Sequence, residues 1–392
     1  TGDVKVGEEI TIDISDIKDK DNFEGYTPTY NYSWDTSSDD GQTWTPLIST
    51  DAKDNNSSYT ITDSEYGKHI RGVLSYMDGY GSEEKVYSSA TKIGLNINMY
   101  WYQIGSNIYG DSGSNSGVVD ISEDGNIVAI GADTYGSNNI GSVRVYKNNK
   151  ETWNQIGEQI PGEHPEDASG MLVKLSGDGS IVAIGSNRND DNGENSGHVR
   201  IYKNENGSWN QIGDDINGEA PGDRYIKSSH HNTYNNLALS NDGSVVAIGA
   251  PFNDGNGENS GHVRIYKNEN GSWNQIGDDI DGKDPNDQSG YSVGLSGDGQ
   301  IVAIGSPEAK NNEDLITGLV RIYKNDNGKW NQIGLDINGE ALNDGFGWSV
   351  TLSNDGSVVA IGAPFNDGNG GYNNGHVRIY KNENGSWNQI GD

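Results

Sequence analysis

The sequence predicts an all-β protein built from two parts, and three observations support this prediction. Short runs of β-branched and aromatic residues recur along the chain, separated by turns rich in Asn, Asp and Gly. From about residue 98 onward the same phrases return in a fixed order, whereas residues 1–97 share none of this periodicity. The hydrophobic content is only 31%, with 56 Gly among 392 residues, as expected when many polar turns surround thin apolar strands.

Residues 1–97 are expected to form an immunoglobulin-like sandwich. Six or seven short strands in about 95 residues is typical of two packed antiparallel sheets. Trp34 is the predicted core tryptophan, because it lies within one of the apolar strand segments. The predicted strands occupy residues 9–14, 29–35, 44–48, 58–62, 69–76 and 85–89.

Residues 98–392 contain an internal repeat. The phrase Trp-Asn-Gln-Ile-Gly, with Tyr replacing Asn in the first copy, begins at Trp101, Trp153, Trp209, Trp273, Trp330 and Trp387, at spacings of 52, 56, 64, 57 and 57 residues. Between copies three further strand-length phrases recur, which in the last unit occupy residues 349–353, 358–362 and 375–381. Four antiparallel strands at this period predict a β-propeller, with five countable four-stranded blades.

The repeated phrases resemble a known family. Gly347-Trp348-Ser349-Val350, the segment 358–364 that ends in Gly-Ala-Pro, and the segment 375–380 are similar to the FG-GAP repeat of integrin alpha-subunit propellers and their bacterial relatives. The family carries a calcium loop of the form Asp-x-Asp-x-Asp-Gly between its first two strands. Here that connection is only Ser-x-Asp-Gly, as in residues 240–243, and one carboxylate cannot supply the six to eight oxygens that calcium takes.

The N-terminal part carries a second resemblance. Residues 63–67 and 75–81 look like segments of the tandem immunoglobulin-like or cadherin-like domains of large bacterial surface adhesins. This resemblance implies an extracellular or cell-surface location. The chain opens with Thr1-Gly2-Asp3 and not with a signal peptide, so we expect a mature product or a fragment.

Composition excludes several classes of partner and chemistry. The chain has 58 Asp and Glu against 26 Lys and Arg, and its net charge of −32 argues against nucleic acid. Apolar runs such as residues 358–361 have the length of one strand, so membrane insertion is not expected. The absence of Cys excludes disulfides and thiol nucleophiles.

Calcium is predicted in the N-terminal part, at Asp19, Asp21 and Asp78. The first two belong to an acidic loop and Asp78 lies in a later Asp-Gly turn, and hard calcium prefers such clustered oxygens. A solvated acidic loop explains the same residues equally well. The loops 189–194, 253–258 and 366–370 also hold carboxylates and amides, but their Asn and Gly favour a structural role in tight turns.

Two recurring patterns are interpreted as scaffold. His198, His262 and His376 each precede Val-Arg-Ile-Tyr on separate blades, so they cannot form one metal site, and we expect packing or an exposed strand start. The segment 37–44 matches the Asp box of sialidase propellers, which in those proteins is a structural hairpin.

The segment 224–234 is the predicted binding segment. It breaks the repeat, accounts for the 64-residue spacing, and is basic and aromatic within an acidic molecule. It is expected on the propeller face where the long, variable loops gather. The predicted ligand-binding residues are Arg224, Tyr225, Lys227, His230, His231 and Tyr234.

These observations favour a noncatalytic extracellular adhesion or recognition module that presents the propeller to a glycan or surface protein. The alternative is a structural subunit of a surface filament or phage fibre, with self-association in a larger assembly. A propeller hydrolase or lyase ranks last, because no converging acid, base or nucleophile set stands outside the repeated scaffold residues. The sequence therefore predicts that the protein is not an enzyme.

Overall fold

The structure is a computed structural model that describes residues 4–15, 17, 25–47, 56–94, 103–136, 138–223, 235–368 and 371–391. The chain forms two compact units, Thr1–Gln103 and Ile104–Asp392, each of which is described by itself. Apart from one 3-10 turn, η1 (Asp63–Glu65), all regular structure of the described residues is β-strand. Within these residues no helix is long and apolar enough to cross a membrane.

The N-terminal unit contains two antiparallel sheets. The smaller pairs β1 (Glu9–Thr11) with β4 (Ser58–Thr60), and the larger has the order β3 (Thr45–Pro46), β2 (Asn31–Ser37), β5 (His69–Met77), β6 (Glu83–Tyr87), with β7 (Thr91–Lys92) also on β5. Trp34 is buried, as predicted, and it packs in one core with Ile10, Tyr59 and Ile70. The finer immunoglobulin-like assignment stays a prediction.

The Asp box of this unit is a capped hairpin turn. The Asp39 carboxylate accepts hydrogen bonds from the Thr43 amide at 2.8 Å, from the Thr43 hydroxyl at 2.6 Å and from the Ser37 hydroxyl at 2.7 Å. The Trp44 indole donates to the Gly41 carbonyl. The Asp39 carboxylate and the Trp44 indole are therefore used by the turn itself, which fits the structural role expected for the motif.

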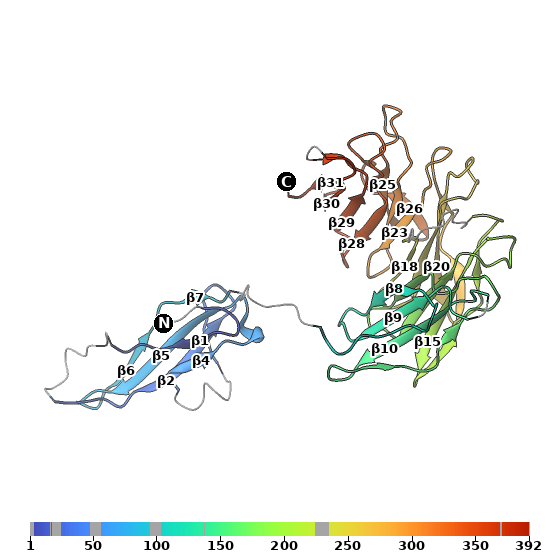
Figure 1. Cartoon of the computed structure of the whole chain (residues 1–392). Helices are drawn as coiled ribbons and strands as arrows, with labels where there is room; N and C mark the ends of the chain where they lie inside the picture. Colours follow the sequence, from blue (N-terminus) through green and yellow to red (C-terminus); the bar gives the residue numbers. More distant parts are fainter. Residues whose placement is uncertain are drawn as a thin grey trace. The chain divides into compact units, whose positions relative to one another are not determined.

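The second unit is a propeller of five consecutive sheets (Figure 1). Each sheet has four antiparallel strands in chain order, and in the first four blades a short fifth segment pairs with the third strand. The first strands of successive blades contact one another, so they lie innermost. Blade 1 is β8 (Ser116–Ile121), β9 (Ile127–Ala132), β10 (Ser142–Asn148), β11 (Trp153–Gln155) and β12 (Ile160–Pro161); blade 2 is β13 (Leu172–Leu175), β14 (Ile181–Ser186), β15 (His198–Glu205), β16 (Ser208–Gln211) and β17 (Ile216–Asn217); blade 3 is β18 (Leu237–Leu239), β19 (Val245–Ala250), β20 (His262–Glu269), β21 (Ser272–Gln275) and β22 (Ile280–Asp281); blade 4 is β23 (Ser292–Leu295), β24 (Ile301–Ser306), β25 (Leu319–Asp326), β26 (Lys329–Gln332) and β27 (Ile337–Asn338); blade 5 is β28 (Ser349–Leu352), β29 (Val358–Ala363), β30 (His376–Glu383) and β31 (Ser386–Gln389).

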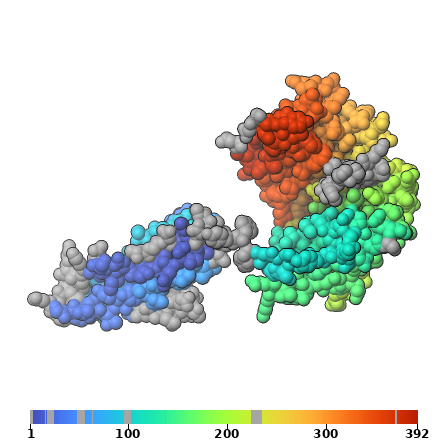
Figure 2. All heavy atoms as spheres, in the orientation of Figure 1, coloured from blue at the N-terminus to red at the C-terminus, as the bar shows by residue number. Residues whose placement is uncertain are grey.

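Apolar contacts between neighbouring blades form the core. In β14, Val182 and Ile184 pack against blade 1, whereas Ala183 between them packs against blade 3. Both faces of the strand are thus covered, which explains why its sequence does not alternate between apolar and polar residues. Figure 2 shows the blades packed side by side in chain order, from teal through green and orange to red.

The repeated tryptophan joins successive repeats by a hydrogen bond. In every described copy the indole Nε1 donates to the carbonyl of the isoleucine in the preceding phrase; Trp209, for example, donates to Ile156 at 2.8 Å. The other pairs are Trp153 with Ile104, Trp273 with Ile212, Trp330 with Ile276 and Trp387 with Ile333. These five indoles therefore connect successive repeats of the propeller.

The turn between the first two strands of each blade is capped from within. In blade 3 the Ser240 hydroxyl donates to Asp242 at 2.7 Å and accepts the Val245 amide at 2.9 Å, and the Ser244 amide donates to the same Asp242 carboxylate. Equivalent serine–aspartate pairs occur in the other four blades. The aspartate of each Ser-x-Asp-Gly turn therefore serves the turn.

Candidate metal centre

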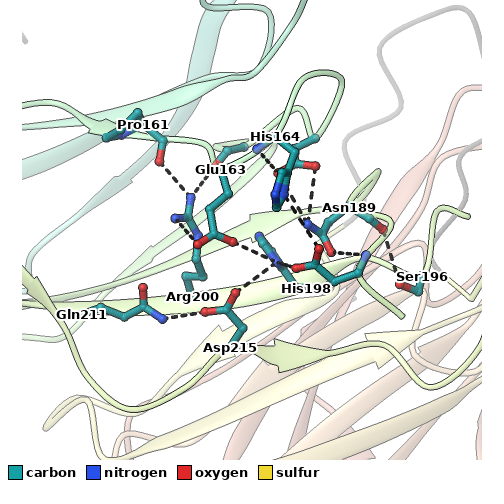
Figure 3. Close-up of polar contacts among 12 residues, drawn as sticks. Pro161, Glu163, His164, Asn189, Ser196, His198, Arg200, Gln211 and Asp215 are labelled. Atoms are coloured by element: carbon teal, nitrogen blue, oxygen red, sulfur yellow. Dashed lines mark hydrogen bonds and ion pairs between the residues drawn. The ribbon is translucent and has the colours of Figure 1, made fainter. Parts of the chain in front are cut away.

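His198 begins the third strand of blade 2, and its imidazole is fully buried. The strand start is held from both sides, because His198 pairs with Ser186 of β14 and with Asn217 of β17. The side chain points toward Glu163, in the connection that links blades 1 and 2, and toward Asp215 of its own blade (Figure 3). A ring nitrogen buried at this position must meet polar groups, since an unsatisfied one would be costly.

Three carboxylates surround this nitrogen (Figure 3). His198 Nδ1 lies 3.6 Å from Asp215 Oδ2, 3.8 Å from Asp191 Oδ2 and 3.9 Å from Glu163 Oε2. One ligand atom from each of the four residues fits within a mutual distance of 4.8 Å. The nitrogen is too far from each carboxylate oxygen for a short hydrogen bond, so the four groups enclose a small polar space.

The carboxylates come from three different connections, each fixed by its own strand. Glu163 follows β12 of blade 1, Asp191 lies in the β14–β15 loop, and Asp215 lies between β16 and β17. Gln211 of β16 donates to Asp215 Oδ1 at 2.6 Å, while the Asp191 amide donates to the Asn189 side chain at 3.0 Å. Such supporting contacts orient ligand groups before any ion arrives.

Arg200 supplies the positive charge nearest to the cluster. Two residues after His198 on β15, it lies 3.5 Å from Glu163 and donates to the Pro161 carbonyl at 2.8 Å. Three carboxylates thus share one guanidinium, and with all of them ionised and the imidazole neutral the set carries a formal charge of −2. A divalent cation would balance that charge.

The protonation of the cluster follows from burial. Burial lowers the pKa of His198 to about 4, and Arg200 lowers it further, against the opposing effect of the nearby aspartates. The imidazole is therefore neutral at pH 7, with a lone pair available to a metal ion. Burial also raises the pKa of Glu163, while Arg200 opposes this and Asp215 and Asp191 add to it.

Blade 3 repeats the centre with one ligand missing. His262 Nδ1 lies 3.6 Å from Asp279 and 3.9 Å from Glu219. The residue equivalent to Asp191 is Gly255, so no side chain closes the fourth side. Gln275 again donates to the aspartate at 2.6 Å.

Blade 4 places a cation of its own at the equivalent position. Leu319 replaces the histidine and Lys283 replaces the glutamate. The Lys283 ammonium lies 3.0 Å from Asp336, which is the equivalent of Asp215, and Arg321 lies 3.0 Å from the same oxygen. Where the chain lacks the histidine and the glutamate, a lysine therefore neutralises the aspartate, which indicates that this position in the blade favours positive charge.

The residues predicted for ligand binding, Arg224, Tyr225, Lys227, His230, His231 and Tyr234, lie outside the described residues, as do Asp19 and Asp21. Their roles stay predictions. Asp78 is described, and its carboxylate accepts the amides of Tyr80 and Ser82 at 2.9 and 2.6 Å. This caps the Asp-Gly turn of the N-terminal unit.

The sequence-based prediction assigned His198 and His262 to packing or an exposed strand start, favoured a structural role for the loop that holds Asp191, and passed over Glu163 and Asp215. It correctly placed the histidines apart from one another, but it did not consider that each one has acidic partners of its own. The repeat contained a signal for these partners. A Gly-Glu pair follows the short fifth strand of a blade whenever the next blade has the histidine. Before blade 4, where Leu319 replaces the histidine, the pair becomes Gly282-Lys283.

One stretch of the propeller matches a family model. Residues 338–380 match the FG-GAP repeat. The stretch spans the connection from blade 4 and the first three strands of blade 5. The resemblance inferred from the sequence is confirmed for this repeat. No curated protein matches the sequence.

Solved propellers are similar to the chain in fold. The β-propeller domain of the Trilobed protease from Pyrococcus furiosus is 14% identical, with a TM-score of 0.41, over 70% of this chain and 71% of that one. The periplasmic gluconolactonase PpgL of Pseudomonas aeruginosa is 15% identical, with a TM-score of 0.42, over 92% and 95%. A proposed 6-phosphogluconolactonase of Bacteroides fragilis is 12% identical, with a TM-score of 0.36, over 81% and 89%.

These neighbours correct the functional prediction. A noncatalytic adhesion module, and with it the absence of enzymatic activity, was expected from the sequence, whereas the similar propellers are named as two lactonases and part of a protease. The prediction ranked catalysis last because no converging acid, base or nucleophile set was found outside the repeated residues, and it did not consider groups that come together only in the folded chain. At this level of identity the likeness concerns the fold and assigns no reaction to the chain.

Proposed function

We propose that this protein binds a divalent transition-metal ion at the centre formed by Glu163, Asp191, His198 and Asp215. The proposal rests on one observation, the buried imidazole facing three carboxylate oxygens at 3.6–3.9 Å. Ligands bound tetrahedrally to zinc at about 2.0–2.2 Å lie roughly 3.3–3.6 Å apart. The three histidine–carboxylate distances are within a few tenths of an ångström of that range. The carboxylate oxygens lie within 4.8 Å of one another, so their movement toward one ion would complete the site.

The ligand chemistry favours zinc or manganese over calcium. Calcium takes six to eight oxygens, whereas a set of one imidazole nitrogen with carboxylates suits first-row transition metals. A neutral imidazole is needed, and the lowered pKa of His198 supplies it at neutral pH. Glu163 and Asp191 are each about one-third exposed, so an ion would have a route in from solvent.

Calorimetry on the metal-free chain tests the proposal. We expect one tight site for Zn²⁺ or Mn²⁺ and much weaker binding of Ca²⁺. Asp215→Asn and Asp191→Ala should each weaken binding at least tenfold. The matched control is Asp214→Asn, which removes the exposed neighbouring carboxylate and should leave affinity unchanged. Equal losses in the control and in Asp215→Asn would reject the site in favour of nonspecific attraction to an acidic protein.

Blade 3 provides a gain-of-function test. Gly255→Asp would add the missing fourth ligand to His262, Glu219 and Asp279. A Cβ at Gly255 would meet only the side-chain oxygen of Asn253 at less than 3 Å, and the equivalent Asn189–Asp191 pair in blade 2 accommodates that contact. The variant should raise the stoichiometry from one tight ion to two, and an unchanged stoichiometry would contradict the ligand assignment.

A catalytic use of the ion is favoured by the position of His164. Its imidazole is mostly exposed, and its Nδ1 lies 3.8 Å from Asp191 Oδ1 and 3.8 Å from Asp167 Oδ2. A histidine beside a metal site can accept a proton from a bound water, which is how metal-assisted hydrolysis begins. Hydrolysis of 4-nitrophenyl acetate that requires Zn²⁺ and falls at least tenfold in His164→Ala, with metal affinity retained, would support this use. Equal rates with and without metal would exclude it for this ester.

A further inference from the structure

The two end blades expose faces that are buried everywhere else in the array. The third strand of each blade presents two aliphatic residues to the following blade, as Val199 and Ile201 of β15 do toward blade 3. Val199 is only 1% exposed, whereas its equivalent in blade 5, Val377, is 66% exposed. Ile379, the next residue on that face, is exposed as well.

Blade 1 exposes the complementary face. The first strand of each blade presents two aliphatic residues to the preceding blade, as Val173 and Leu175 of β13 do toward blade 1. Val173 is 2% exposed, whereas its equivalent Val119 is 59% exposed and Ile121 is similarly open. Beside Val119 lies a hollow of about 150 Å³, lined also by Ile130 and Tyr146.

These two faces are the halves of one interface that the chain already makes four times. The outgoing face of blade 5 has the residue types that cover the incoming faces of blades 2–5. Because the halves differ, association of two copies would be head-to-tail and not two-fold symmetric. Exposed contiguous apolar surface of this kind is typical of interaction sites.

We propose that blade 5 of one copy of this chain docks on blade 1 of a second copy, with Val377 and Ile379 packed against Val119 and Ile121. Contacts at the outer edge are compatible with this arrangement. Trp153 of blade 1 now donates to the Ile104 carbonyl of a Gln-Ile-Gly phrase. Residues 389–391 at the end of blade 5 are the same three residues, so the Ile390 carbonyl can take the place of Ile104 when the blades dock.

Sedimentation velocity and light scattering on the full chain test the proposal. The net charge of −32 opposes association, so the buffer should contain at least roughly 0.3 M salt to screen it. The mass is expected to rise above the monomer value of 42.2 kDa with increasing concentration. Val377→Lys and Val119→Lys should each remain at the monomer mass, whereas Leu335→Lys, which changes an exposed leucine elsewhere, should behave as the wild type.

A mixing experiment separates head-to-tail docking from two-fold or nonspecific association. Each lysine variant retains one intact face, so an equimolar mixture of Val377→Lys and Val119→Lys should form a 1:1 dimer that cannot grow further. Circular dichroism should show that both variants are folded. A wild type that stays monomeric at every concentration, or a mixture that forms no dimer, would overturn the proposal and leave both faces to another partner or to closure within one chain.

Discussion

His198→Leu should remove a defined part of the acid sensitivity of the propeller. The residue is fully buried, and its pKa is lowered from 6.5 to about 4 by burial, with Arg200 contributing. Blade 4 has Leu319 at the equivalent strand position, also buried, so the fold accepts leucine there. The substitution thus replaces the titrating ring while retaining an apolar side chain of similar size.

The magnitude follows from linkage. A pKa lower in the folded than in the unfolded chain means that the unfolded chain binds more protons between the two values. Stability is therefore greatest above pH 6.5 and is lost as pH falls from 6.5 to about 4. A difference of about 2.5 pKa units corresponds to roughly 3 kcal/mol. Glu163, Asp191, Asp215 and Arg200 face the same space and remain in both proteins, so the comparison isolates the histidine.

Urea unfolding of the wild type and the variant with chelator present measures this difference. Hydrogen exchange of β15 provides a local readout, because the two units of the chain need not unfold together. Between pH 7 and pH 4 the wild type should lose about 3 kcal/mol more than His198→Leu. Parallel pH profiles would show that the imidazole is not held neutral by its surroundings, and would refute the electrostatic argument for the centre.

The same unfolding experiment, repeated with added zinc, tests the metal proposal. An ion that binds only the folded chain stabilises it by about 2.7 kcal/mol at one hundred times its dissociation constant. At pH 7 zinc should therefore raise the wild-type unfolding free energy and leave His198→Leu nearly unchanged. Equal stabilisation of both proteins would place the ion elsewhere.

Three further predictions concern the scaffold. Gly249→Ala would bring a Cβ within 2.0 Å of a backbone oxygen of the neighbouring blade, so urea titration should show an unfolding free energy lower by about 2 kcal/mol or more. In the control Gly117→Ala the Cβ meets nothing closer than 4.0 Å, and the unfolding free energy should not change. Trp330→Phe removes the 2.8 Å bond to the Ile276 carbonyl and should cost about 1 kcal/mol, measured by the same assay. The hydrogen bonds from Thr43 and Ser37 hold the pKa of Asp39 at about 2, so its carboxylate carbon should show no NMR titration between pH 7 and 4; a midpoint near 4 would contradict the turn geometry.

Much of the fold was predictable because its strands and turns depend on local sequence patterns. The repeated tryptophan phrase and the Asn, Asp and Gly of the turns specify strand lengths and hairpins residue by residue, so the five sheets agree with the sequence period. These features depend on neighbours within one repeat, which a single sequence displays directly.

The candidate centre could not be predicted in the same way, because its residues come from successive connections of the array. Glu163 and Asp215 are separated by 52 positions, and each looks like an ordinary acidic loop residue in a chain with 58 of them. The pairing of β17 with β15 inside blade 2 brings Asp215 to His198, and the packing of blade 2 on blade 1 brings Glu163 there. The second of these contacts depends on how neighbouring blades pack, which no local pattern encodes.

The sequence by itself determined the repeat, the strands of each blade and the chemical character of their faces, since these follow from residue periodicity and turn chemistry. The tertiary structure decided which of those faces are covered and which polar groups share a space. Val199 and Val377 occupy the same place in the same phrase, yet one is buried and the other exposed. The difference arises because burial depends on a neighbouring blade and not on the residue itself, and the same dependence turns His198 from a repeated strand residue into a member of a candidate metal centre.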